Sequence, residues 1–268
     1  MLINNIAALT IAGSDSGGGA GIQADLKTFS ALRVFGTTVI TAVTAQNLRE
    51  VTAIQPIDPG IIEKQLQAVL EGFPVKAIKT GMLFSAEIIK SAAGILERYP
   101  DIPLIIDPVI TATSGSELLR KEAVNTLKTQ LFPQAALITP NIAEVKILAD
   151  IDFEIENGDD VERAARLLFE KLKVPVLLKG GHLPGSACDV LCDPDGTTAY
   201  DADLIPGVNN HGSGCTLSAA ITALMARGQG IREAVSEAKK YITGCLSQPY
   251  LLDADTRIIN HFCRTILQ

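Results

Sequence analysis

Two glycine-rich segments contain residue types that can bind an anion. The first reads GSDSGGGAGIQAD over residues 13–25, and the second reads GVNNHGSGCT over residues 207–216 and leads into an apolar helical pattern. Small residues let backbone N–H groups come close to an anion, and a helix that follows directs its positive end at the same place. We expect the amides of Gly212, Ser213 and Gly214 to stabilise charge that develops on a transferring phosphoryl group. An ordinary N-cap by a hydroxyl side chain of this segment is the alternative.

Cys215 stands where the second glycine-rich segment becomes a helix. A glycine loop and a helix start both lower the pKa of a thiol, which favours the thiolate near neutral pH. Such a thiolate could accept the proton of a substrate hydroxyl as a general base. Two alternatives remain open: a small residue that fits beneath bound phosphates, and the nucleophile of a cysteine hydrolase that uses His211. No third orienting group is evident for the hydrolase.

Residues 19–24 of the first segment match the dinucleotide-binding pattern G-x-G-x-x-A. That class of protein has an acidic residue about 20 positions later, at the end of the second strand, which binds ribose hydroxyls. Here the second strand ends in Gln46 and Asn47, and the next acid after Asp25 is Glu50. A dehydrogenase is therefore disfavoured. The P-loop pattern G-x-x-x-x-G-K-[ST] is also absent, so a kinase with this sequence must assemble its phosphate site differently.

Short aliphatic runs alternate with amphipathic helical patterns along the chain. Continuous apolar runs are typical of strands that are buried on both faces. The six candidate strands are residues 6–12, 37–43, 76–79, 104–107, 136–139 and 176–179. One helical pattern is expected to share a single apolar face formed by Ile61, Leu66, Val69 and Leu70. The alternation predicts an α/β fold with a mostly parallel central sheet and helices on both faces.

The C-terminal half of the chain adds two expectations. Residues 187–191 and 197–200 flank a CDPDGT turn whose Asp-Gly pair is a hairpin signal, which predicts an antiparallel edge to the sheet. The pattern over residues 215–267 is helical. No linker or repeat interrupts the chain, so we expect residues 1–268 to form one domain. Ligands of open parallel sheets bind beyond the carboxyl ends of the strands, and six polar or glycine-rich strand ends are expected to converge on one crevice here.

The formal charge of −7 and the absence of a basic run disfavour nucleic acid or an anionic membrane as a partner. The apolar N-terminal stretch is too short to span a bilayer and lacks the basic region of a signal peptide. Five cysteines, an odd number, indicate a reducing compartment. We therefore expect a cytoplasmic protein.

Seven motifs together resemble one family: AGSDSGGGAGIQADLKTF, VITAVTAQN, KTGML, DPVITATSGSELL, LITPNIAE, LLKGGHLPG and NHGSGCTLSAAI. In this order, over residues 7–228, they are similar to the hydroxymethylpyrimidine/phosphomethylpyrimidine kinases of thiamine biosynthesis, which have a ribokinase-like fold. The resemblance implies a homodimeric kinase that uses ATP and Mg²⁺. It also implies phosphorylation of the hydroxymethyl group of the pyrimidine, and then of the monophosphate. The sequence departs from the family pattern in two places. It has GSGC where the family commonly has GTGC, and its C-terminal tail lacks the usual glycine-rich approach to its His-Phe.

The resemblance, together with strand-end positions, suggests which residues bind the substrate ring. We expect Asp25 and Gln46 to hold the ring, Gly13 to let it approach the backbone, and Met82 to pack against its face. Gln46 offers both a donor and an acceptor to an aminopyrimidine edge. Core filling is the alternative for Met82. Related sugar kinases have Asp at the place of Cys215, which supports the general-base role by resemblance.

Four residues are expected to bind ATP and Mg²⁺. Mg²⁺ prefers oxygen ligands and keeps several waters, so one or two carboxylates suffice to hold it, and Asp107 and Glu144 are the candidates. Asn141 and Lys179 are expected to bind the nucleotide, because the lysine ends the run VPVLLK where its charge can reach phosphate oxygens. Glu144 as an ordinary first-turn acid of a helix, and Lys179 as the partner of a carboxylate, remain open.

Two other functions remain open beside the pyrimidine kinase. A pyridoxal or pyridoxine kinase of the same superfamily is the nearer one. A non-catalytic nucleotide sensor, which would bind ATP without turnover, is the other.

Overall fold

The computed structural model describes residues 6–111, 119–120, 122–181, 187–254 and 256–263. Its main sheet consists of β1 (Ala7–Asp15), β2 (Phe35–Gln46), β3 (Val51–Pro56), β4 (Val75–Thr80), β5 (Leu104–Ile106), β6 (Leu137–Ile138), β7 (Val176–Lys179), β8 (Asp189–Asp193) and β9 (Gly196–Tyr200). The nine strands lie in the order β3-β2-β1-β4-β5-β6-β7-β8-β9.

The six strands expected from the apolar runs form the parallel centre of this sheet. β2, β1, β4, β5, β6 and β7 pair in parallel with their neighbours. β8 and β9 are antiparallel, as the hairpin signal predicted. β3 forms a second antiparallel edge, beside β2, that the sequence did not predict. The α/β fold with an antiparallel edge is confirmed.

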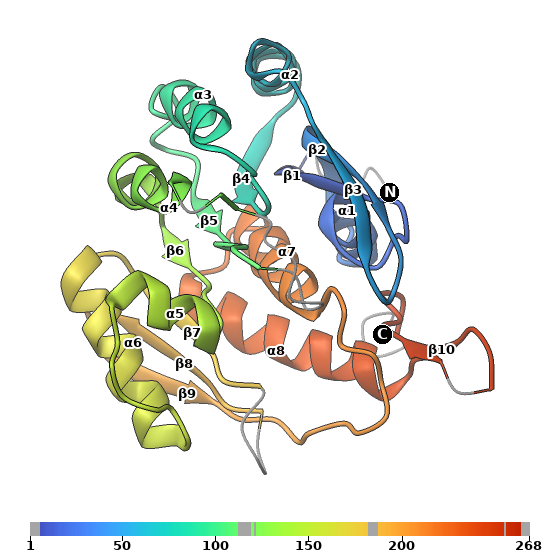
Figure 1. Cartoon of the computed structure of the whole chain (residues 1–268), viewed down its shortest axis with the longest axis vertical. Coiled ribbons are helices and arrows are strands. Elements are labelled where there is room, and N and C mark those ends of the chain that lie inside the picture. Colours follow the sequence, from blue (N-terminus) through green and yellow to red (C-terminus); the bar gives the residue numbers. More distant parts are fainter. Residues whose placement is uncertain (1–5, 112–118, 121, 182–186, 255, 264–268) are drawn as a thin grey trace.

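Helices cover both faces of the sheet (Figure 1). One face packs against α2 (Pro59–Gly72), α3 (Ala86–Leu96), α4 (Ala123–Thr126), α5 (Ile142–Ala149) and α6 (Gly158–Leu172). The other packs against α1 (Gly21–Ala31), α7 (Ser213–Ala226) and α8 (Ile231–Ser247). A π-helical turn (Leu127–Leu131) and a 3₁₀ turn (Phe132–Gln134) follow α4.

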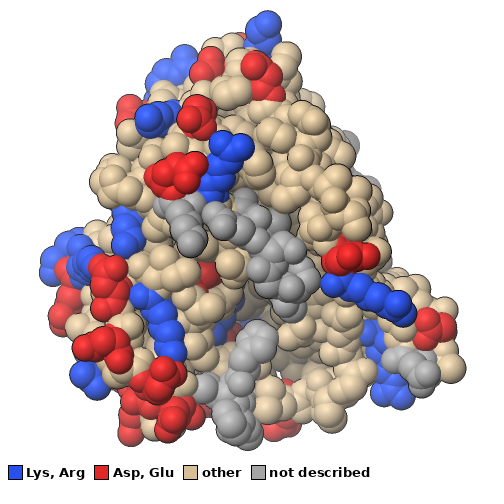
Figure 2. All heavy atoms as spheres, viewed as in Figure 1, with Lys and Arg blue, Asp and Glu red and all other residues tan. Residues whose placement is uncertain are grey.

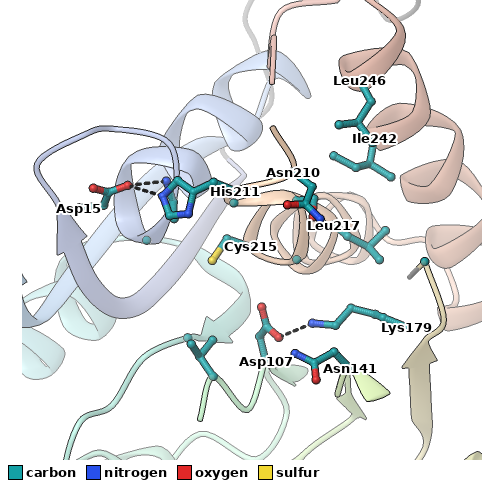
Figure 3. Close-up of a pocket in the computed structure, with 18 of the residues that line it drawn as sticks. Asp15, Asp107, Asn141, Lys179, Asn210, His211, Cys215, Leu217, Ile242 and Leu246 are labelled. Atoms are coloured by element: carbon teal, nitrogen blue, oxygen red, sulfur yellow. Dashed lines mark hydrogen bonds and ion pairs between the residues drawn. The ribbon is translucent and has the colours of Figure 1, made fainter. Parts of the chain in front are cut away.

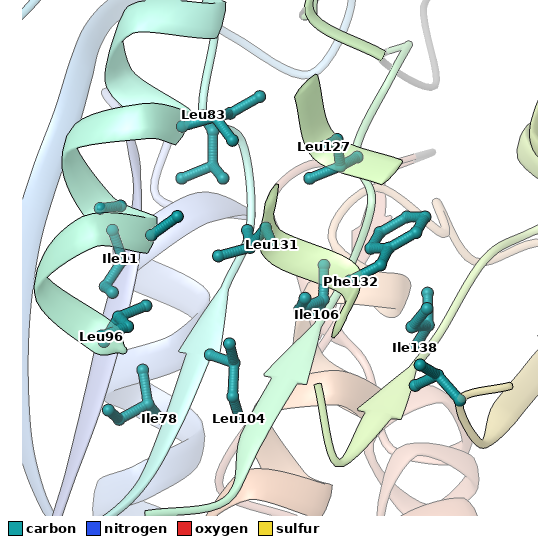
Figure 4. Close-up of a cluster of buried hydrophobic side chains, with 14 of the residues drawn as sticks. Ile11, Ile78, Leu83, Leu96, Leu104, Ile106, Leu127, Leu131, Phe132 and Ile138 are labelled. Carbon is teal, nitrogen blue, oxygen red and sulfur yellow. The ribbon is translucent and has the colours of Figure 1, made fainter. Parts of the chain in front are cut away.

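The core on the first face consists of large aliphatic side chains (Figure 4). Leu9 and Ile11 of β1 point to this face, whereas Ala8 between them belongs to the core of the other face. This alternation follows from the period of two in a strand. Ala77 of β4 is likewise part of the second core. Small residues on that side let a helix lie close to the sheet.

That helix is α7, which is buried around most of its circumference. Its buried residues include Ala219, Ala220 and Ala223, and it lies between the sheet, α1 and α8 (Figure 1). A helix that is apolar on all sides belongs in a protein core. The packing fixes α7 with its N-terminus at the carboxyl ends of the strands.

Two expectations for the helices were wrong. In α2, Leu66 and Leu70 are buried and Val69 packs against the core as expected, but Ile61 is exposed and Ile62 takes its place, because Ile62 precedes Leu66 by four residues on the same helix face. The continuous helical pattern expected over residues 215–267 ends with α8 at Ser247, and the short antiparallel pair β10 (Tyr250–Leu251) and β11 (Arg257–Ile258) follows, while Leu267 itself lies outside the described residues. The physical reason is Pro249, since the residue before a proline is disfavoured in the helical region.

Acidic and basic side chains are interspersed on the face of the molecule shown in Figure 2, and acidic ones gather around α6. None of the helices in the described part of the chain combines the length and apolar character needed to cross a bilayer.

Candidate active site

A cavity of about 360 Å³ opens at the carboxyl ends of the parallel strands, beside the N-terminus of α7 (Figure 3). Residues at or just beyond the carboxyl ends of β1, β2, β4, β5, β6 and β7 line it, so the expected convergence of strand ends on one crevice is confirmed. All predicted site residues except Asp25 line this cavity, namely Gly13, Gln46, Met82, Asp107, Asn141, Glu144, Lys179, Gly212, Ser213, Gly214 and Cys215.

The two glycine-rich segments touch each other at one wall of the cavity. Gly212 precedes α7 with a left-handed φ of 84°. A Cβ atom on Gly212 would lie 1.8 Å from the carbonyl oxygen of Gly19. Both the backbone conformation and the close approach therefore require glycine at this position.

The amides at the start of α7 match the expected anion site in part. The Ser213 N–H donates to the carbonyl oxygen of Asn210 at 3.0 Å, so this donor is already engaged. The N–H groups of Gly214 and Cys215 lie in the first turn, where a helix offers them no acceptor. Of the expected donors, the Gly214 amide therefore remains available and the Ser213 amide does not, while the Cys215 amide is an additional donor in the same turn.

Lys179, at the end of β7, and Asp107, after β5, form an ion pair beside α7 (Figure 3). The distance from Nζ to Oδ1 is 2.8 Å, and Ser218 donates to Oδ2 of Asp107 at 3.1 Å. A Cβ atom on Gly214 would lie 3.1 Å from Nζ of Lys179. Burial opposes ionisation of Asp107, but the ammonium groups of Lys179 and Lys79 hold the pKa of this carboxyl below its ordinary value. An ammonium next to a helix N-terminus suits phosphate oxygens.

Asn141 and Glu144 form a capping box at the start of α5. Oδ1 of Asn141 accepts from the Glu144 amide at 2.9 Å, and Oε2 of Glu144 accepts from the Asn141 amide at 2.8 Å. Burial raises the pKa of Glu144 to about 7, against the opposing charge of Lys179. Glu144 is therefore a first-turn helix acid, as the alternative held, and its carboxyl also faces the cavity.

Gln46, Gly13 and Met82 lie together at the ends of β2, β1 and β4. The two ends of the Gln46 amide lie 3.1 Å from Oγ1 of Thr44 and 3.2 Å from Nε2 of His211. A Cβ atom on Gly13 would lie 3.0 Å from Sδ of Met82, so glycine keeps this part of the cavity open. The structure thus brings three of the four expected ring-binding residues to one end of the cavity.

Asp25 lies beneath the cavity rather than in its wall. Its side chain is fully buried, forms an ion pair with Nζ of Lys79 at 2.7 Å, and accepts a hydrogen bond from Oγ1 of Thr10 at 2.6 Å. Burial disfavours the ammonium, but the Asp25 carboxylate raises the pKa of Lys79 above its ordinary value. The direct contact with a ring that we expected of Asp25 is not available to a side chain in this position.

The expectation of a Cys215 thiolate at neutral pH was wrong for the site in this state. Burial raises the pKa of the Cys215 thiol to about 11; Lys79 acts against this effect, and the carboxylates of Asp25 and Asp107 add to it. The helix start is thus outweighed by loss of hydration and by two nearby negative charges. The hydrolase alternative gains no support, because His211 bonds to Asp15 and Gln46 rather than to Cys215 in the described structure.

Three features of the cavity were missed. Asp15 and His211 form a polar pair at the end where Gln46 lies; the NNHG sequence beside GSGC was the available signal (Figure 3). Lys239 and Asp189 form a buried pair of 2.7 Å in the cavity wall. Apolar side chains line the opposite end: Leu204, Ile205, Val208, Leu217, Ile242 and Leu246. They come from a loop and two helices, so no sequence periodicity groups them.

In the described parts of the chain, no three His, Cys, Asp or Glu side chains form a ready-made metal site. Mg²⁺ in kinases needs less than that, because one or two carboxylates and the phosphates of the nucleotide can hold it. Asp107 and Glu144 both line this cavity, so the carboxylates available there fit Mg²⁺ in number and type.

The solved structures most informative for this chain share its fold. Phosphomethylpyrimidine kinase from Clostridium difficile 630 aligns with a TM-score of 0.78 and 45% identity over 89% of this chain and 98% of that one. Pyridoxal kinase from Bacillus subtilis, in an ADP complex, aligns with a TM-score of 0.86 and 37% identity over 96% and 98%. The fold and the cavity define a kinase of the ribokinase-like class.

The family model described as phosphomethylpyrimidine kinase matches residues 15–259. The hydroxymethylpyrimidine/phosphomethylpyrimidine kinase of Rhizobium meliloti is 47% identical over 243 residues, which cover 90% of each chain. The thiamine biosynthesis bifunctional protein ThiED of Geobacter sulfurreducens is 44% identical over 94% of this chain, which spans 51% of that protein. This chain belongs to the phosphomethylpyrimidine kinase family, as its motifs predicted.

Proposed function

We propose that this protein, as one kinase domain over residues 1–268, uses ATP to phosphorylate 4-amino-5-hydroxymethyl-2-methylpyrimidine and then its monophosphate, in thiamine biosynthesis. The observation that carries the proposal is the single cavity in which a Lys179–Asp107 pair and the N-terminus of α7 lie next to Gln46, Gly13 and Met82. The names of the relatives support both phosphorylations.

ATP is proposed to lie with its base between the apolar residues of α7 and α8 and its phosphates toward Lys179 and Asn141. The apolar end suits a purine, and the charged end suits phosphates. Titles of structural neighbours support nucleotide use, since two pyridoxal kinases of this fold are in complex with ADP and with AMP-PCP.

Mg²⁺ would supply charge neutralisation at the phosphates when it is bound, and Asp107 and Glu144 are the residues proposed to hold it. Asp107→Asn and Glu144→Gln should each raise the Mg²⁺ concentration needed for half-maximal rate by about tenfold, because each loses a charged ligand. The rate is measured over a Mg²⁺ titration at saturating ATP. An unchanged Mg²⁺ requirement in both variants would remove both carboxylates from the metal site.

Cys215 is proposed to lie at the point of phosphoryl transfer, with the amides of Gly214 and Cys215 stabilising the charge that develops there. Loose phosphoryl transition states need little help from a base, so a protonated thiol is compatible with this position. Cys215→Ala should lower kcat by roughly 10²-fold if the sulfur contacts the reacting groups. A full kcat in Cys215→Ala would exclude the sulfur from phosphoryl transfer and leave charge stabilisation to the amides.

Gln46, Gly13 and Met82 are proposed to bind the substrate ring. Asp25 is proposed to support this end of the cavity from beneath, through its ion pair with Lys79. Gln46→Leu should raise the KM for the pyrimidine alcohol by about 10²-fold, because a polar ring edge would face an apolar side chain. The KM for ATP serves as the internal control, and an unchanged pyrimidine KM would exclude Gln46 from ring binding.

A pyridoxal kinase is the second candidate, favoured by the pyridoxal kinases among the structural neighbours, with TM-scores up to 0.86. A coupled assay of ADP release with the pyrimidine alcohol, its monophosphate and pyridoxine separates the two activities. ATP binding without turnover of any of the three would indicate a nucleotide sensor instead.

We also propose a homodimer in the cytoplasm. Phe35 of β2 stacks on Phe73 with ring centroids 5.8 Å apart, and both rings are exposed. Exposed apolar clusters of this kind favour association. The mass in solution, measured by light scattering, tests the dimer.

A further inference from the structure

Asp15 and His211 join the two glycine-rich segments across the end of the cavity where Gln46 lies. Oδ2 of Asp15 is 3.1 Å from Nε2 of His211, although the two residues are 196 positions apart in the chain. The imidazole also covers the first segment, since a Cβ atom on Gly19 would lie 2.9 Å from Cδ2 of His211. The ring is therefore held in place by a polar contact and by packing.

The protons on this network can be assigned from its partners. Asp15 accepts hydrogen bonds from the amides of Gly17 at 2.8 Å, Gly19 at 3.1 Å and Ala20 at 2.8 Å. Burial opposes ionisation, but the hydrogen bonds from His211 and from the loop amides lower the pKa of Asp15 below its ordinary value. An ionised carboxylate only accepts hydrogen bonds, so Nε2 of His211 must carry a proton.

That proton also determines how the Gln46 amide is turned. One end of the amide lies 3.2 Å from the same Nε2, and an N–H there requires the carbonyl oxygen to face it. The other end lies 3.1 Å from Oγ1 of Thr44, whose single proton has two acceptors within reach, this end of the amide and the carbonyl oxygen of Ser14 at 3.0 Å; the amide turned toward His211 leaves the proton to Ser14. Thr44 can then only accept from the amide NH₂. His211 thus selects this orientation, and Thr44 accommodates it by donating to Ser14.

We propose that His211, kept as the Nε2–H form by Asp15, is a positioning residue that fixes the Gln46 amide with its carbonyl toward His211 and its NH₂ toward Thr44. The inference rests on the proposed function, in which Gln46 binds the substrate ring. Each neighbour uses one of the two lone pairs or one of the two N–H groups of the amide, so one acceptor and one donor remain for a ligand. The order of this remaining donor and acceptor along the cavity wall is therefore fixed.

A fixed order selects between rings of nearly identical shape. The 4-aminopyrimidine edge has an acceptor at its ring nitrogen and a donor at its amino group, which complements the remaining donor and acceptor of Gln46. In the 4-oxo analogue, 5-hydroxymethyl-2-methylpyrimidin-4-one, the ring nitrogen carries a proton and the oxygen accepts, so the order is reversed. A Gln46 amide that is free to rotate would accept either ring, whereas a fixed one accepts the amino ring alone.

The test compares the two rings as substrates of the full-length enzyme and of two variants. His211→Phe keeps an aromatic ring over Gly19 but has no N–H, whereas His211→Gln keeps an N–H donor in a smaller, flexible side chain. Wild-type enzyme should prefer the amino ring by roughly 10²-fold or more in kcat/KM, because the wrong ring leaves buried polar groups unpaired. In His211→Phe this preference should fall at least about tenfold, through the KM for the amino ring, with kcat and the ATP KM little changed.

His211→Gln should retain the preference within about threefold, since its N–H can replace Nε2–H. A role in packing alone predicts the opposite ranking, with His211→Phe closer to wild type. Asp15→Asn, which removes the charge that holds the proton on Nε2, should lose the preference in the same way and serves if His211→Phe does not fold. Thermal melting confirms that each variant tested is folded.

The outcomes separate this inference from the function on which it rests. A wild-type enzyme inactive on both pyrimidines would overturn the proposed function and the inference together. An active wild type whose ring preference is unchanged in His211→Phe and in Asp15→Asn would overturn the positioning role alone.

Discussion

Two of the lysine–aspartate pairs at the cavity differ in their access to it. Lys79 and Asp25 lie 2.7 Å apart with no exposed side-chain surface on either residue. Lys179 and Asp107 lie 2.8 Å apart, and the lysine side chain keeps 14% of its surface exposed. The residue types and the distances match, so any difference between the pairs must come from their surroundings.

Because their surroundings differ, the two pairs have different roles. The enclosed pair ties α1 to β4, and through Thr10 to β1, and neither charge can reach a ligand. The open pair can replace one of its contacts with phosphate or Mg²⁺, because one side of each group faces the cavity. Ionic partners of equal geometry therefore stabilise the fold in one place and remain available for binding in the other.

Lys79→Met should give the largest effect, on stability. It leaves the Asp25 carboxylate buried without its partner, which costs about 3–5 kcal/mol of unfolding free energy. Urea denaturation followed by circular dichroism measures the loss. The double variant Asp25→Leu/Lys79→Met is the control and should recover most of it, because no charge is then left buried. Equal losses in the single and double variants would contradict a paired role.

Lys179→Met should instead lower activity. Removing the cation at the phosphate site should reduce kcat/KM by about 10²–10³-fold. Its effect on unfolding free energy should stay well below that of Lys79→Met, since Asp107, although only 2% exposed, retains its bond to Ser218 and the nearby charge of Lys79. Equal losses of unfolding free energy in Lys79→Met and Lys179→Met would contradict the different roles of the two pairs.

Glu144, next to the open pair, should give the smallest effect, visible as a pH dependence. Its pKa rises from 4.5 in the unfolded chain to about 7 in the fold. Between these values the folded state binds more protons, so stability falls as pH increases from 4.5 to 7 and then levels. Glu144→Gln lacks this slope, so its unfolding free energy relative to wild type should rise by about 2–3 kcal/mol between pH 5 and pH 8. Parallel curves for the two proteins would show that Glu144 does not titrate in this range.

The sequence predicted the parts of the fold that depend on continuous apolar runs. Most of the six central strands are of this kind, whereas β3 was missed because VTAIQP is half-exposed and lacks such a run. α8 ends at Ser247, a boundary set by one residue, Pro249, within a pattern that otherwise continues. Boundaries of this kind depend on local backbone sterics, which periodicity does not represent.

For the site, position along the strands predicted which residues would meet, but not which of them would be reachable. Asp25 was expected at the end of the first loop but lies in α1, where its partner Lys79, 54 residues away, encloses it. The pKa of Cys215 depends on burial and on charges from three other elements. Such quantities belong to the tertiary structure, and no spacing in the sequence reports them.

The contact between Gly212 and Gly19 also limits the routes by which this sequence can diverge. A side chain at Gly212 would collide with the backbone of the first loop, and one at Gly19 would collide with His211. Neither glycine can therefore be replaced alone while the two loops keep their course. A lineage that reshapes one loop must reshape the other in step, so the two segments are expected to be inherited as a matched pair.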